Sequence, residues 1–184
     1  MKIWDLQEDV NVYEHITLVN GSNEEWIKFG DMFQGKQLRE EWQPLKLKLI
    51  QHGGTLKKGD MPYLSPGVPV FSDKAIHVLK SQFSSCVEVL DTDCDIGDYK
   101  IINVIKVINC LDYEKSEILR YRDSDRIKAI SKYVFKLDLI EKLNIFKIVE
   151  QPRGKVFVSD EFRNKVIQSG LEGFKFIEVW DSEE

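Results

Sequence analysis

Residues 156–168 read VFVSDEFRNKVIQ, and this stretch decides how the C-terminal part of the chain is expected to fold. Its first three residues are apolar and β-branched or aromatic, which is typical of a buried strand. Ser159 suits the position before a helix, where its hydroxyl accepts a hydrogen bond from a free backbone N–H group. Phe162 and Val166 follow at helical spacing, and Gly170 suits the residue just beyond the helix end. The stretch therefore predicts a strand that turns directly into a helix.

A second stretch, near the middle of the chain, has the same pattern. Residues 68–71 are extended, Ser72 suits a helix cap, and an apolar stripe continues to Phe83. In both units a strand is expected to return after the helix, at residues 87–90 and 174–180. The likeness has two interpretations, an internal repeat or two uses of common capping chemistry, and the second is preferred because serine caps are frequent.

Further strands are predicted from short runs of apolar and β-branched residues. Residues 99–109 are apolar on both faces and predict one long central strand. Residues 24–42 have no clean period and predict short helical turns, and a loop is expected at residues 51–60. The remaining strands are expected at residues 1–6, 16–19, 45–49, 127–135 and 145–149. Since few helices separate these strands, the sequence predicts an α+β fold, a largely antiparallel sheet with a few helices packed on one side.

No stretch rich in proline, glycine or serine interrupts this pattern, so residues 1–184 are expected to form a single domain. Within it, residues 59–184 are expected to be the main α+β core, and residues 1–58 a subregion with weaker sequence signals. A chain of 184 residues with 42% hydrophobic residues can bury a core that needs no metal or disulfide.

Charge and composition exclude several classes of partner. The net charge of −5 would repel a polyphosphate backbone, so no nucleic-acid partner is expected. The N-terminus lacks the apolar segment of a signal peptide, and no apolar run approaches the length of a membrane span. The three cysteines match no metal-ligand spacing and are expected to be free thiols in a reducing compartment. These features predict a cytoplasmic protein without a membrane partner.

Residues 91–98 begin like a calcium loop, with carboxylates at alternate positions. Ile96 stands where such a loop needs glycine, and Ile102 stands where it needs a bidentate glutamate. A solvated hairpin turn is therefore expected here, and neither a metal nor another cofactor is expected anywhere in the chain.

A second acidic group consists of Asp112, Glu114 and Glu117. Alternating carboxylates after a strand could serve as a paired acid and base, or they could form an exposed strand face. Exposure is the preferred interpretation, because the sequence shows no histidine partner that would perturb their pKa values. No nucleophile, base or metal set is recognisable elsewhere, so no catalytic residue is predicted.

Five segments together carry a family resemblance: WQPLK at 42–46, GVPVFSDKA at 67–75, LDYEKS at 111–116, PRGKVFVSDEF at 152–162 and GLEGF at 170–174. In this order they resemble a bacterial family first catalogued as a domain of unknown function and later assigned as an immunity protein family of polymorphic toxin systems. The resemblance covers most of the chain and is strongest from Gly59 onward. The matching residues are mostly caps, turns and core aromatics.

The resemblance implies a cytoplasmic protein that binds and neutralises a co-produced toxin. We expect the mechanism to be occlusion, in which a pre-folded surface covers the active site or substrate groove of the toxin. Asp112, Glu114 and Glu117 are the predicted contact residues on this protein. Two alternatives remain: a small hydrolase-like enzyme that uses an acidic pair, and a generic protein-interaction module.

Overall fold

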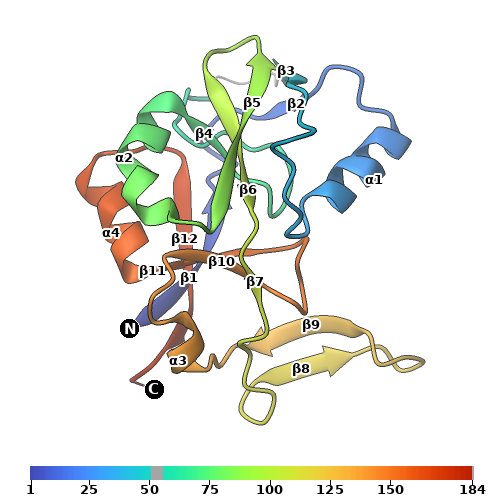
Figure 1. Cartoon of the computed structure of the whole chain (residues 1–184), viewed down its shortest axis with the longest axis vertical. Helices are drawn as coiled ribbons and strands as arrows, with labels where there is room; N and C mark the ends of the chain where they lie inside the picture. The colour runs from blue at the N-terminus through green and yellow to red at the C-terminus, as the bar shows by residue number, and fades with distance from the viewer. Residues whose placement is uncertain (51–55, 184) are drawn as a thin grey trace.

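A computed structural model describes residues 1–50 and 56–183 of the chain (Figure 1). Helices and strands are both present and most strand pairs are antiparallel, which confirms the α+β class. The strands form two five-stranded sheets and one two-stranded sheet, whereas the sequence predicted one sheet. Part of the loop predicted at residues 51–60 lies outside the described residues.

The first sheet joins the two ends of the chain. Its strands, in spatial order, are β12 (Phe174–Asp181), β1 (Lys2–Glu8), β11 (Val156–Ser159), β10 (Ile145–Ile148) and β7 (Val107–Ile108). The neighbours in this sheet are antiparallel except for β7 and β10, which are parallel.

The second sheet combines strands from the N-terminal and middle parts of the chain. Its spatial order is β2 (Ile16–Leu18), β3 (Leu45–Leu49), β5 (Val87–Cys94), β6 (Tyr99–Val104) and β4 (Val70–Ser72). Only β3 and β5 are parallel neighbours. The two-stranded sheet consists of β8 (Glu117–Arg120) and β9 (Ile127–Lys132). The helices are α1 (Asn23–Met32), α2 (Asp73–Phe83), α3 (Leu137–Ile140) and α4 (Asp160–Gln168).

The single central strand predicted at residues 99–109 was wrong. The chain leaves strand geometry at Ile105 and Lys106, whose N–H groups both donate to the Cys86 oxygen. After this break, β7 pairs with β10 in the other sheet. The break is invisible in the sequence because both halves of the run are apolar.

The two strand–helix–strand units have the same strand arrangement. In the first unit, β4 and β5 flank β6 and are antiparallel to it. In the second unit, β11 and β12 flank β1 and are antiparallel to it. The helices of the two units, α2 and α4, pack against each other (Figure 1). The likeness between the units therefore extends from capping to strand order.

Both of these helices begin at the predicted serines. The Ser72 hydroxyl accepts from the Ala75 N–H group at 3.1 Å, and the Ser159 hydroxyl accepts from the Phe162 N–H group at 3.2 Å. Each hydroxyl also donates to a polar side chain outside its helix. Gly170 follows α4 with a φ angle of +61°, which confirms the predicted helix end.

The buried side chains form three clusters. One lies under α2 and α4, and a second lies between the first sheet and the β8–β9 hairpin. The third packs α1 on the second sheet through Phe29 and Phe33. The prediction of short helical turns at residues 24–42 was wrong, because α1 is one helix of 10 residues. Its start carries a capping box of Ser22 and Glu25, which offers a sequence signal for it.

Candidate partner-binding surface

The predicted contact residues do not share a strand face. Asp112 and Glu114 lie around a turn at residues 112–116, and only Glu117 belongs to a strand, β8. The Asp112 carboxylate accepts the N–H groups of Glu114 at 3.1 Å and Lys115 at 3.3 Å. These bonds satisfy N–H groups that the turn would leave without partners. The strand-face geometry was therefore wrong, and Asp112 has a structural role in the turn.

Glu114 and Glu117 are exposed to solvent. Glu117 lies opposite Lys132 in the hairpin, and its carboxylate accepts the Ser131 hydroxyl at 3.1 Å. Beside them, the exposed Tyr113 donates its hydroxyl proton to the Glu150 carboxylate, and this bond raises the pKa of the tyrosine. The turn therefore presents one free glutamate and one aromatic ring to solvent, on a backbone that Asp112 holds in place.

A groove of about 600 Å³ lies between this turn, the end of β9 and the end of β12. Asp112 and Lys132 line one part of it, and Trp180 and Asp181 line another. Two cations, Lys115 and Lys132, and two carboxylates, Asp112 and Asp181, belong to this lining. The groove therefore offers charges of both signs.

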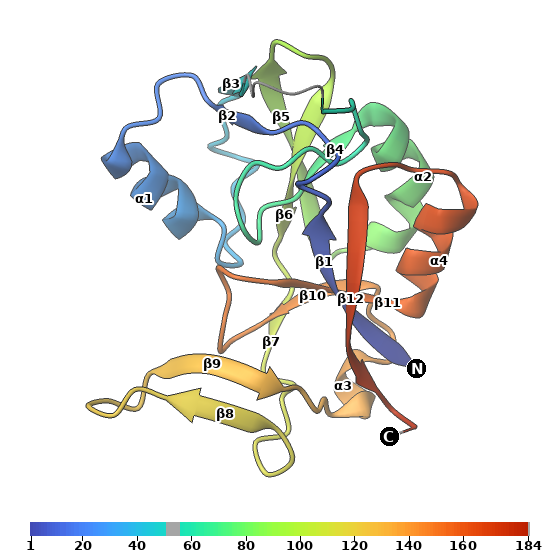
Figure 2. The same ribbon diagram turned by 180° about the vertical axis from the view of Figure 1, so that it is seen from behind.

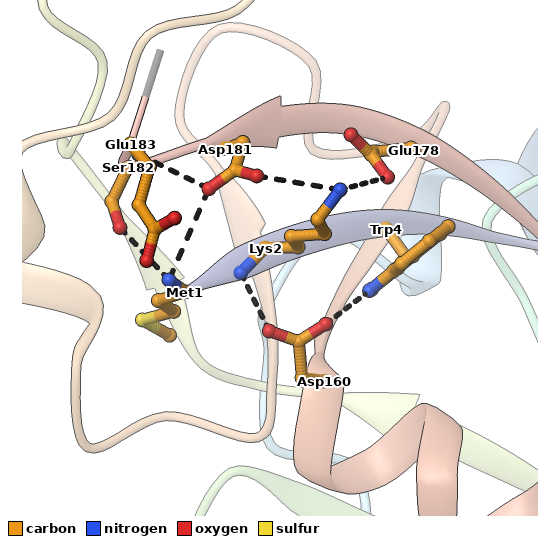
Figure 3. Close-up of polar contacts among 8 residues, drawn as sticks. All are labelled: Met1, Lys2, Trp4, Asp160, Glu178, Asp181, Ser182 and Glu183. Atoms are coloured by element: carbon orange, nitrogen blue, oxygen red, sulfur yellow. Dashed lines mark hydrogen bonds and ion pairs between the residues drawn. The ribbon is translucent and has the colours of Figure 1, made fainter.

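The wall formed by β12 is held in place by the first residues of the chain (Figure 3). The Lys2 ammonium donates to Glu178 at 2.8 Å and pairs with Asp181 at 3.3 Å. The Glu183 N–H group, together with the Lys2 ammonium, holds the pKa of Asp181 below its usual value. The hydrogen bonds that the Lys2 ammonium donates to Glu178 and Asp181 raise the pKa of Lys2.

Asp160 connects the start of α4 to β1 (Figure 3). Its carboxylate accepts the Lys2 N–H group at 2.6 Å and the Trp4 indole N–H group at 2.9 Å. The Arg163 guanidinium covers the Trp4 ring at 4.3 Å from its centre. Sequence reasoning placed Asp160 at the helix dipole and missed its bonds to β1, because that pairing joins opposite ends of the chain.

The β8–β9 hairpin lies beside the predicted contact residues and consists mostly of exposed residues. Ile118, Ile127 and Ile130 attach it to the core cluster on the first sheet. On its other side Leu119 is 54% exposed, and Tyr121 at its tip is 46% exposed. The hairpin belongs to neither large sheet and extends at one end of the molecule (Figure 2). Sequence reasoning expected a strand at residues 127–135 but missed β8, because four mostly exposed residues give little apolar pattern.

The acidic stretch at residues 91–98 forms the expected hairpin between β5 and β6. Asp91 pairs with Lys100 across the strands at 2.7 Å. The three cysteines are free, as predicted, and burial raises the pKa of Cys110 to about 12. Within residues 1–50 and 56–183, no group of three or more His, Cys, Asp or Glu side chains is arranged to hold a metal ion.

Comparison with known proteins gives one assignment. None of the curated proteins matches the chain. The part of the chain that the structure describes contains no helix with the length and apolar character needed to cross a membrane. A family model described as "Immunity protein family (Imm11)" matches residues 74–181. The match begins at the start of α2, includes the turn and the β8–β9 hairpin, and ends with β12. Because it covers more than half of the 184 residues, the chain belongs to this immunity protein family.

Proposed function

We propose that the protein binds a cognate toxin of a polymorphic toxin system in the cytoplasm and neutralises it by occlusion. Membership of the immunity family carries this proposal. Occlusion is favoured by a surface that is already folded, because such a surface loses little conformational entropy on binding. The turn is held by the hydrogen bonds of Asp112, and three isoleucines pack the hairpin against the core, so both meet this need.

The contact residues proposed are Asp112, Glu114 and Glu117. Glu114 and Glu117 would face basic groups of a toxin that handles nucleic acid or nucleotides, while Asp112 keeps the turn in shape. Exposed Tyr113 supplies an aromatic side chain in the same turn, a residue type that is enriched in interface cores.

The experiment is co-expression with the proposed cognate toxin, followed by association kinetics on the purified pair. The double variant Glu114→Gln with Glu117→Gln removes two negative charges from the proposed contact. It should slow association and flatten the salt dependence of the association rate, since charge steering acts mainly on that rate. The matched control is Glu40→Gln with Glu41→Gln, two exposed carboxylates in the loop after α1. Growth protection without a detectable complex would contradict the binding proposal and favour the hydrolase-like alternative.

A further inference from the structure

The β8–β9 hairpin carries a charge opposite to that of the whole chain. Between Glu117 and Lys132 there are five cations and three carboxylates, whereas the net charge of the protein is −5. The five cations are Arg120, Arg122, Arg126, Lys128 and Lys132. All five are exposed. The hairpin is therefore a basic element on an acidic protein.

These cations are available to a partner. Across the described ranges, none of the five forms an ion pair within 4.0 Å, although Asp123 and Asp125 belong to the same hairpin. Arg120 donates to the Asp125 backbone oxygen, and the Arg126 guanidinium lies 5.3 Å from the centre of the Tyr121 ring. Two arginines thus brace the tip, while the charges remain without a counter-ion in the protein.

The hairpin also carries exposed apolar side chains, and its opposite side packs against the core. Leu119 lies opposite Ala129, and both are exposed. On the other side, Ile130 is only 9% exposed and fixes the hairpin to the core. An exposed apolar centre with a charged rim is the arrangement found in protein interfaces.

We propose that the β8–β9 hairpin is the element that docks into the toxin, and that the receiving surface of the toxin is an acidic cleft with an apolar floor. This inference rests on the proposed function. Arg122 and Lys128 face carboxylates of the toxin, and Leu119 and Tyr121 contact its apolar floor. The basic hairpin and the acidic Glu114 beside it place positive and negative groups next to each other in the interface. This arrangement fixes the orientation of the two proteins.

The test uses the full chain and the proposed cognate toxin. Arg122→Glu with Lys128→Glu reverses two hairpin charges, and Lys48→Glu with Lys165→Glu makes the same change at exposed lysines of β3 and α4. At low salt the hairpin variant should associate about tenfold more slowly and show a weaker salt dependence, whereas the control should change little. Thermal unfolding checks that both variants fold. Leu119→Ala should mainly accelerate dissociation.

The outcomes separate the two proposals. If the wild-type protein binds the toxin and the hairpin variant binds as the control does, the hairpin inference is overturned and the proposed function stands. If the wild-type protein forms no complex, both are overturned. Slower association in the hairpin variant alone, with faster dissociation in Leu119→Ala, supports docking through this hairpin.

Discussion

The side chain of Lys147 donates a hydrogen bond of 2.7 Å to the backbone oxygen of Phe33, across 114 positions of sequence. Phe33 caps the C-terminal end of α1, where the helix dipole favours a cation. Lys147 is fully buried in β10, so this bond joins the N-terminal helix to the first sheet. Burial lowers the pKa of the ammonium to about 8.

Replacing this lysine should remove a pH dependence of stability. Because the folded pKa of Lys147 is about 8 and the ordinary pKa of a lysine is 10.5, the unfolded state binds more protons between these values. The free energy of unfolding therefore rises with pH across this window, by roughly 3 kcal/mol at most. Urea unfolding at several pH values should show this rise in the wild-type protein and a smaller rise in Lys147→Met. Equal pH profiles would mean that Lys147 keeps an ordinary pKa.

The cap of α4 should contribute measurably to stability. Ser159→Ala removes the bond to the Phe162 N–H group and leaves the Asn144 side-chain oxygen without its donor at 2.6 Å. We expect a loss on the order of 1 kcal/mol in the free energy of unfolding. Gln168→Ala, at an exposed position of the same helix, is the control and should change little. Equal stability of Ser159→Ala and the wild-type protein would contradict this role.

Glycine should stabilise the protein more than serine does at position 84, just after the end of α2. Ser84 has a φ angle of +45°, and the Cys86 N–H group bonds to the Phe83 oxygen at 2.9 Å, as in a type II′ turn. Ser84→Gly should raise stability by about 1 kcal/mol because it relieves this backbone strain. Ser85→Gly is the matched control and should lower stability through the entropy of the unfolded chain. Destabilisation of similar size in both variants would show that Ser84 is not strained.

Unfolding should occur in one cooperative step. Both large sheets combine strands from residues 1–58 with strands from residues 59–184, so the N-terminal subregion cannot separate without breaking them. Calorimetry should give a single transition whose calorimetric and van't Hoff enthalpies agree. Two separated transitions would instead support independent domains.

The sequence predicted the local structure better than the long-range arrangement. The strands that lie next to a serine cap were predicted because capping and apolar pattern are local signals. The break at Ile105 in the predicted strand of residues 99–109 depends on which sheet each half of that stretch joins. No local pattern encodes that choice. At the candidate site, the role of Asp112 depends on turn geometry, and the hairpin cations are visible as a group only once β8 and β9 are paired.

The central claim is that the protein acts by binding and not by turnover. The most direct measurement is a titration of the activity of the proposed cognate toxin with increasing amounts of the purified protein. Binding predicts that toxin activity falls linearly and reaches its minimum at a fixed molar ratio, with no further change over time. Progressive loss of toxin activity, or of a toxin product, at far less than one equivalent of the protein would contradict the claim and show that the protein is an enzyme.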